Sequence, residues 1–139
     1  GVSNFEQADL QNIFAACTVP PQVNQVLLHV GNTPTELLDF CTENNMLVEA
    51  YSPIAHGEIL GNAEVGVMAE RYSVSVPQLC IRYALQLGTV PLPKTTNPEH
   101  MRTNADVDFV ISDADMEALH GMNVTDYGKS GKFPVFSGK

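Results

Sequence analysis

The chain is poor in basic residues, and this shortage excludes one large class of function. Seven Lys and Arg stand against sixteen Asp and Glu, which gives a formal net charge of −9. A phosphate backbone would repel such a chain, so nucleic-acid binding is not its main role. A small anionic cofactor is still compatible with this charge, because the local groups of a site decide whether it binds.

Cysteine is also scarce, and no long apolar run is present. Cys17, Cys41 and Cys80 are widely spaced and form no C-x-x-C motif. This odd count indicates reduced thiols in a cytoplasmic protein, most simply as small buried hydrophobic residues. No apolar run reaches membrane-spanning length, and no charged start precedes an apolar stretch. We therefore expect neither a membrane partner nor a signal peptide.

Several familiar motifs are missing. The chain contains no G-x-G-x-x-G, no P-loop and no legible Ser-His-Asp set. The four histidines show no metal-ligand spacing. Two of them, His29 and His56, shortly follow predicted strand ends, so a role in a site is open for them. The simpler interpretation is a surface or partly buried imidazole.

What is present is an alternation of short apolar runs with helical patterns. The 139 residues are 44% hydrophobic and 17% charged, which suits one globular domain with a real core. Strands that alternate with helices predict a parallel sheet. We expect one strand that ends at Val2 and further strands over 23–28, 46–51 and 89–92. We expect helices over 6–17, 63–72, 76–87 and 112–121, and two more that begin near Thr33 and Asn97.

Helix-start signals support these boundaries. Thr33, Pro34 and Glu36 predict an N-cap, a first helical residue and the return partner of a capping box. Further N-caps are expected at Ser75 (with Gln78), Asn97 (before Pro98) and Ser112, with Gly121 ending the last helix.

Four of the apolar runs end in polar residues of a binding type. These pairs are Ser3-Asn4, Asn24-Gln25, Tyr51-Ser52 and Lys94-Thr95. Ligands of parallel α/β folds gather at the carboxyl ends of the strands, so we expect the four pairs to face one common site. The first strand has almost no chain before it, which suggests that the chain begins in the middle of an architecture.

Each of these side chains has a functional and a simpler interpretation. Lys94 and Thr95 just before a helix start suit a phosphate, or Lys94 is a solvated surface lysine. Tyr51 offers a flat face for a planar ring, or is a half-buried core tyrosine. Asn4 and Gln25 suit an amide ligand, or bond to nearby backbone. The combination at successive strand ends favours the functional interpretation.

These motifs, in their order and spacing, resemble the strand-end motifs of the aldo-keto reductases. The resemblance rests on 1–5, 23–25, 50–53, 92–95 and 104–109, and it covers nearly the whole chain. That family is an α/β fold, a (β/α)8 TIM barrel, that reduces aldehydes and ketones with NADPH. The resemblance implies that residues 1–126 are the second half of such a barrel, strands five to eight, and that 127–139 are its carboxy-terminal tail.

The resemblance also implies a set of residues that bind NADP(H). Ser3, Asn4 and Gln25 would bond to the nicotinamide carboxamide, and Tyr51 would stack on the ring. Ser52 and the loop 54–60 would lie along the pyrophosphate. The adenosine end would be held by Lys94 and Thr95 at the 2′-phosphate, by His100 at the adenosine phosphate and by Asn104 at the adenine.

Two departures from the family pattern concern the adenosine end. Many relatives have an arginine where this chain has His100, although Arg102 is close by and offers a substitute. Many also have a glutamate where this chain has Thr103. The preference for NADPH over NADH is therefore left open.

The family's catalytic Asp, Tyr, Lys and His come from its first four strands, and none can be matched here. We therefore expect no catalytic residue in this chain, which would be the cofactor-binding half of an enzyme for a small-molecule carbonyl substrate. A half-barrel exposes strand edges and its inner layer, so it should pair with the missing amino-terminal half or with a second copy. The alternatives are a nucleotide-binding half-barrel without turnover and a non-catalytic interaction subunit.

Overall fold

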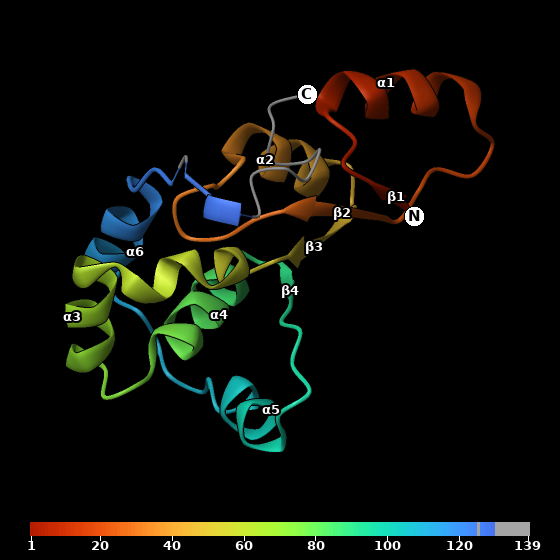
Figure 1. The fold of residues 1–139 in the computed structure, drawn as a ribbon. Helices are drawn as coiled ribbons and strands as arrows, with labels where there is room; N and C mark the ends of the chain where they lie inside the picture. The colour runs from red at the N-terminus through yellow and green to blue at the C-terminus, as the bar shows by residue number, and fades with distance from the viewer. Residues whose placement is uncertain (125, 130–139) are drawn as a thin grey trace.

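The structure, a computed structural model, describes residues 1–124 and 126–129. In this part of the chain, four parallel strands pair in the order β1-β2-β3-β4, with helices between them (Figure 1). The strands are β1 (Val2–Ser3), β2 (Val23–Leu27), β3 (Leu47–Tyr51) and β4 (Val90–Leu92). The helices are α1 (Gln7–Ala16), α2 (Thr35–Glu43), the 3₁₀ segment η1 (Ala55–Gly61), α3 (Ala63–Arg71), α4 (Val76–Gln86), α5 (Pro98–Ala105) and α6 (Asp113–His120).

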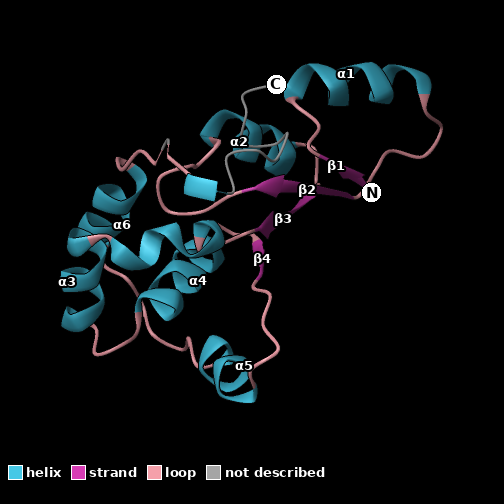
Figure 2. Cartoon of the chain, in the orientation of Figure 1, coloured by secondary structure: helices cyan, strands magenta, loops and turns pink. Residues whose placement is uncertain are grey.

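The predicted alternation of strands and helices is confirmed. Figure 2 shows the four strands side by side, and Figure 1 shows α3, α4 and α6 grouped together and α5 reached from β4 by an extended connection. The predicted N-caps at Ser75, Asn97 and Ser112 all accept a backbone N–H, and Gln78 completes the capping box of α4. Most of the predicted carboxy-terminal tail, residues 130–139, lies outside the described residues.

The start of α2 differs from the prediction. Pro34, not Thr33, is the N-cap, and no side chain caps this helix. The Thr33 hydroxyl is instead 2.7 Å from the hydroxyl of Tyr83 on α4. A tertiary hydrogen bond has replaced the local one, and sequence spacing does not reveal such a competition.

The two faces of the sheet have different environments. Asn24, Val26, Val48 and Ala50 are buried on the side that the helices cover, while the alternate side chains are partly buried or, at Leu47, exposed. One-sided cover by helices is typical of the wall of a barrel. The uncovered face, which we call the inner face, carries Ser3, Gln25, Glu49 and Val90 in one row, with Leu27, Tyr51 and Leu92 in the next.

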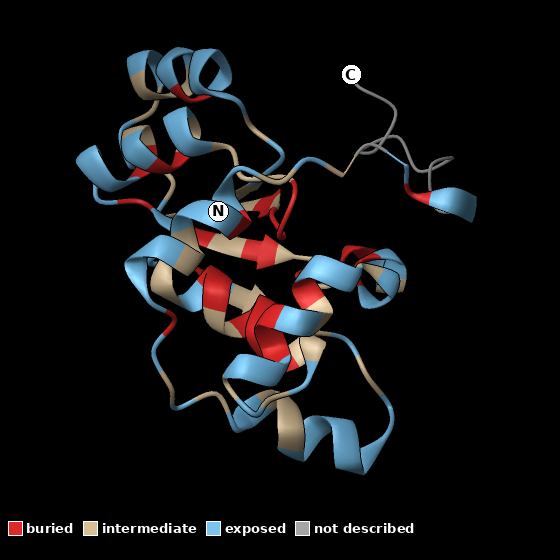
Figure 3. Cartoon of the chain, turned by 90° about the vertical axis from the view of Figure 1, so that its left-hand side faces the viewer, coloured by how far each residue is buried: buried red, intermediate tan, exposed pale blue. Residues whose placement is uncertain are grey.

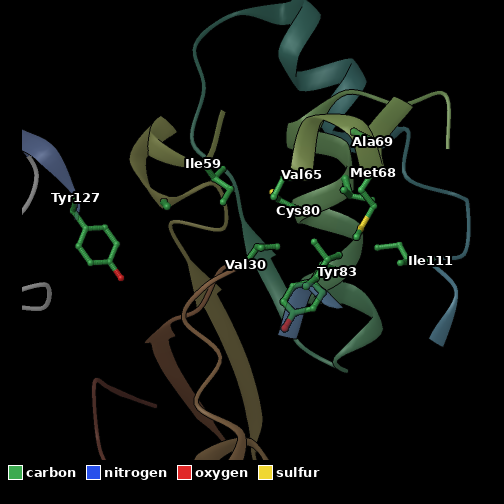
Figure 4. Close-up of a cluster of buried hydrophobic side chains, with 12 residues drawn as sticks. Val30, Ile59, Val65, Met68, Ala69, Cys80, Tyr83, Ile111 and Tyr127 are labelled. Carbon is green, nitrogen blue, oxygen red and sulfur yellow. The ribbon is translucent and has the colours of Figure 1, made fainter. Parts of the chain in front are cut away.

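Two apolar clusters hold the elements in place. One lies between the sheet and α1 and α2 and includes Leu10, Leu28 and Leu38. The other joins α3, α4 and the segments around α6, with Tyr83 and Cys80 fully buried in it (Figure 4). Figure 3 shows the buried positions concentrated along the strands and on the helix faces that meet. This packing fixes the strand ends, where the candidate site lies.

Candidate functional site

A row of polar side chains crosses the inner face, from the end of β1 to the middle of β2 and β3. Ser3, Gln25 and Glu49 are direct neighbours in the register of β1, β2 and β3. Gln25 Nε2 donates a hydrogen bond to Glu49 Oε2 at 2.8 Å, and Ser3 Oγ donates to the Gln25 carbonyl at 3.2 Å. Side chains on one face of neighbouring strands meet in this way because the strand period is two.

Asn4 reaches the same face through an unusual backbone conformation. Strict alternation would send its side chain to the opposite side from Ser3. Its φ of 55° lies in the left-handed region, which Asn tolerates better than most residues. Asn4 Oδ1 accepts a hydrogen bond from the Tyr51 hydroxyl at 3.0 Å. Burial raises the pKa of Tyr51, and the bond to Asn4 partly opposes this rise.

Ser3, Asn4 and Tyr51 line one pocket of about 510 Å³ at the carboxyl ends of the strands. Its other walls are the starts of α1 and α2 and the end of β2. Phe5, Glu6 and Asp9 line it at the start of α1, Pro34 and Leu37 at the start of α2, and Val26 and Leu27 at the end of β2. The volume lies in the range typical of small-molecule sites, and its lining combines apolar with polar groups. The structure therefore brings three of the predicted residues together.

The second predicted pair is split by the structure, because β2 continues past it to Leu27. Gln25 lies within the strand on the inner face, not at the strand end. Asn24 is fully buried on the other face, where its Nδ2 donates to the Phe5 carbonyl at 2.8 Å. The prediction that all four pairs face one site is therefore wrong for Asn24, since adjacent residues of a strand point to opposite faces.

Ser52 follows β3 with a left-handed backbone, φ 52°, and begins a strained loop. Its hydroxyl is 3.0 Å from His56 Nε2. Ala55, His56 and Gly57 also have positive φ values. Such conformations cost free energy outside glycine and cluster at ligand sites. The loop that the resemblance assigned to the pyrophosphate is thus a short 3₁₀ segment with an unusual backbone.

The predicted phosphate and adenine residues lie beyond β4, away from the pocket. Lys94 is exposed two residues after β4, and Thr95 Oγ1 accepts from the backbone N–H of Asn97 at 3.1 Å. Asn97 in turn caps α5. Three strand spacings of about 4.8 Å separate β1 from β4, so the two groups stand roughly 14 Å apart along one edge. This separation suits an elongated ligand with unlike ends.

His100 and Asn104 both lie on α5, and neither lines the pocket. His100 is exposed and Asn104 is half-buried. Arg102, the suggested substitute for an arginine at position 100, forms an ion pair with Glu99 on the same helix. A phosphate would have to compete with this carboxylate for the guanidinium group.

Glu49 was not singled out from the sequence, and for His29 a role in a site was only left open. Glu49 was taken as part of an apolar run, although a charged residue inside a strand is itself a signal. His29 is fully buried, with Nδ1 2.8 Å from the Val30 carbonyl and Nε2 3.2 Å from the Tyr127 hydroxyl. Burial lowers the pKa of His29. Its partner is 98 positions away, so no local pattern reveals the pair.

The described residues contain neither a metal-ligand group nor a membrane-spanning helix. Residues 1–124 and 126–129 contain no group of three or more side chains able to hold a metal ion. Within the same ranges, no helix is long and apolar enough to cross a membrane.

Comparison with known proteins identifies the family. Residues 1–124 match the family model described as "Aldo/keto reductase family". The chain is 36% identical over 124 residues to the glyoxal reductase of Bacillus subtilis, covering 88% of this chain and 45% of that protein. It is 37% identical over 127 residues to a 9,11-endoperoxide prostaglandin H2 reductase of Trypanosoma cruzi, covering 88% and 45%. The chain spans about half the length of the curated relatives it matches.

Solved structures show the same similarity in three dimensions. The protein Gox0644 in its apo form matches with a TM-score of 0.85 and 36% identity, over 92% of this chain and 48% of that one. A Bombyx mori aldo-keto reductase in complex with NADP matches with a TM-score of 0.81 and 28% identity, over 88% and 44%. The α/β fold is thus similar to that of aldo-keto reductase barrels, and the chain belongs to the aldo/keto reductase family.

Proposed function

We propose that this chain is the cofactor-binding half of a cytoplasmic, NADP(H)-dependent carbonyl reductase. Residues 1–126 would form strands five to eight of the barrel, and 127–139 its tail. One observation carries the proposal: Ser3, Asn4 and Tyr51 share a pocket at the carboxyl ends of the strands, with Gln25 in the adjoining row. Relatives whose structures contain NADPH or NADP support the choice of cofactor.

The donor and acceptor groups of the pocket fit a nicotinamide. Asn4 and Gln25 each carry an amide, and Ser3 adds a hydroxyl, so together they satisfy both the C=O and the NH₂ of a carboxamide. Tyr51, held by Asn4, offers its ring for stacking. The bound cofactor would supply a hydride to a carbonyl carbon of the substrate. The proton donor is expected from a part of the barrel that this chain does not match.

The groups beyond β4 would hold the adenosine end. Lys94 and Thr95 carry a positive charge and a hydroxyl close to the start of α5, which suits the 2′-phosphate. His100 would face the adenosine phosphate and Asn104 the adenine. Ser52 and the loop after it would run along the pyrophosphate between the two ends.

The exposed inner face supports a covering partner. Leu47, Val90 and Leu92 are 44%, 40% and 37% exposed, and the outer edges of β1 and β4 pair with no strand among the described residues. Burial of apolar area favours association by about 25 cal/mol per Å². The partner would be the amino-terminal half of the barrel or a second copy of this chain. Sedimentation at low concentration tests this, and a compact, stable monomer would argue against it.

Equilibrium titration with NADPH, followed by its fluorescence, tests the cofactor assignment. Lys94→Ala removes a charge-assisted hydrogen bond to phosphate and should weaken NADPH binding by about tenfold or more. The same variant should change NADH affinity little, because NADH lacks the 2′-phosphate. Lys129→Ala, which removes an exposed lysine from the tail, is the matched control for charge. An equal loss of affinity for NADPH and NADH in Lys94→Ala would show that Lys94 does not bind the 2′-phosphate.

Turnover separates this proposal from a half-barrel that only binds nucleotide. The chain alone should bind NADPH without oxidising it in the presence of a generic aldehyde. Oxidation by the isolated chain would contradict the assignment of the proton donor to another part of the barrel. Recovery of turnover on adding an amino-terminal half-barrel from a relative would support the reductase.

A further inference from the structure

Glu49 is the one charged side chain among the residues of the four described strands. It lies half-buried on the inner face, in the row between Gln25 and Val90. A carboxylate in a sheet face is costly to desolvate and is rarely placed there without partners. Gln25 Nε2 donates a hydrogen bond to Glu49 Oε2 on this face, at 2.8 Å. Glu49 therefore acts on the residue assigned to the nicotinamide carboxamide.

The carboxylate determines which way round the Gln25 amide lies. An ionised carboxylate only accepts hydrogen bonds, so the NH₂ end of Gln25 must turn toward Glu49. The Oε1 end is then left as the acceptor for a ligand. Asn4 is oriented in the opposite sense, because its Oδ1 accepts from Tyr51 and its Nδ2 is left as a donor. Asn4 in the pocket and Gln25 in the adjoining row thus offer one donor and one acceptor in a defined order.

This order selects one orientation of a bound carboxamide. Its NH₂ would donate to Gln25 Oε1, and its C=O would accept from Asn4 Nδ2. Rotating the carboxamide by half a turn would place acceptor against acceptor and donor against donor. The carboxamide is attached to the nicotinamide ring. The donor and acceptor order of Asn4 and Gln25 therefore favours one face of the ring pointing into the barrel.

The same carboxylate distinguishes the two redox states of the cofactor. The oxidised nicotinamide ring carries a positive charge that the reduced ring lacks. The Glu49 carboxylate, which is hydrogen-bonded to Gln25, attracts the positively charged oxidised ring more strongly than the neutral reduced ring. Burial of the inner face would reduce the screening of this attraction by water and salt. We propose that Glu49 is a positioning residue that sets the polarity of Gln25 and raises the affinity for NADP⁺ relative to NADPH. This inference rests on the proposed function.

Dissociation constants for NADP⁺ and NADPH, measured by calorimetry on the 139-residue chain, test the inference. Glu49→Gln removes the charge but keeps an oxygen that can accept from Gln25. It should raise the ratio of the NADP⁺ to the NADPH dissociation constant by roughly threefold to tenfold. Glu49→Leu removes the acceptor as well, and should weaken binding of both forms in addition to shifting the ratio. Glu49→Asp, which retains the charge, should restore part of the wild-type ratio.

A control and a direct readout separate the possible results. Glu70→Gln makes the same chemical change at an exposed position on α3 and should leave the ratio unchanged. The side-chain NH₂ resonances of Gln25, observed by NMR without cofactor, should move in Glu49→Leu and not in Glu70→Gln. Thermal unfolding shows whether each variant is folded. If Glu49→Leu is not folded, the comparison of Glu49→Gln with Glu49→Asp still tests the role of the charge.

Three outcomes would overturn the inference. An unchanged ratio in Glu49→Gln, with normal binding by the wild type, rejects the role of Glu49 and leaves the proposed function standing. An equal shift in Glu70→Gln attributes the effect to net charge. A wild-type chain that binds neither form rejects the proposed function, and the inference fails with it.

Discussion

Asn4 and Ser52 each follow a strand directly, and each has a left-handed backbone. At Asn4 this conformation turns the side chain onto the inner face, where it meets Tyr51. The sequence identified both residues as candidates by type and place. It did not predict their φ values. The conformation of Asn4 is coupled to a contact with Tyr51, which lies 47 positions further along the chain.

The hydroxyl of Tyr51 offers a way to separate stacking from positioning. Tyr51→Phe keeps the ring but removes the bond to Asn4, so NADPH should bind roughly twofold to tenfold more weakly. Tyr51→Ala should weaken binding further, because the ring is lost. Tyr72→Phe removes a hydroxyl that bonds Asp115, far from the pocket, and should leave NADPH affinity unchanged. Wild-type affinity in Tyr51→Ala would exclude stacking on this residue.

His29 gives the stability of the fold a defined pH dependence. The Val30 carbonyl only accepts, so His29 Nδ1 donates to it, and in the neutral ring Nε2 accepts from the Tyr127 hydroxyl. Burial, the largest cause, lowers the pKa of His29 in the folded state. The hydrogen bond to the Val30 carbonyl partly opposes this, His56 lowers the pKa further, and the net shift is downward. The unfolded state therefore binds more protons below about pH 6.5, the ordinary histidine pKa.

It follows that His29 stabilises the fold fully above pH 6.5, and that this contribution is lost as the pH falls below that value. The free energy of unfolding should fall by at most about 1.4 kcal/mol per pH unit from this group. Urea unfolding between pH 7.5 and pH 5 measures the slope. His29→Gln should flatten it, whereas His100→Gln, at an exposed position, should not. A slope that persists in His29→Gln would assign it to another group.

At the scale of elements, local patterns predicted most boundaries. Apolar runs and capping residues gave both ends of β3, α4 and α6, and the start of α5, within two residues, because these signals act over a few positions. Two features depended on distant partners instead. Thr33 bonds to Tyr83 across the fold, and Asn24 and Gln25, inside a strand predicted over 23–28, face opposite sides of the sheet. A pair of adjacent polar residues does not reveal which one faces the helices until the register is known.

The segment after α6 packs on the loop between β2 and α2 at Gly31 as well as at His29. Gly31 has φ 93°, and the Val124 backbone N–H donates to its carbonyl at 3.0 Å. A Cβ at Gly31 would lie 2.4 Å from Val124 Cγ2. Gly31→Ala should therefore destabilise the fold by about 1–3 kcal/mol and speed hydrogen exchange at the Val124 amide.

Gly61→Ala is the matched control, because a Cβ there meets no atom within 4 Å. Its unfolding free energy should stay within about 0.5 kcal/mol of the wild type. Similar losses in the two variants would mean that the contact between Gly31 and Val124 does not hold this segment.

At the scale of the whole molecule, the sheet is covered by helices on one face and is largely open on the other. The groups proposed to bind the carboxamide and those proposed to bind the phosphate stand at opposite ends of one sheet edge, an order that suits an extended dinucleotide. The sequence motifs predicted this edge through resemblance to the aldo-keto reductases. The pocket itself could not be predicted, because Phe5, Pro34 and Leu37 form its walls through packing of α1 and α2.

Backbone NMR of this 15.1 kDa chain during titration with NADPH tests the central claim most directly. The account predicts that the perturbed amides gather at the carboxyl ends of β1 to β4, around Asn4, Ser52 and Lys94, and that the amino ends of the strands are unaffected. Perturbations scattered over both ends of the sheet, or confined to the helices that cover its outer face, would contradict it.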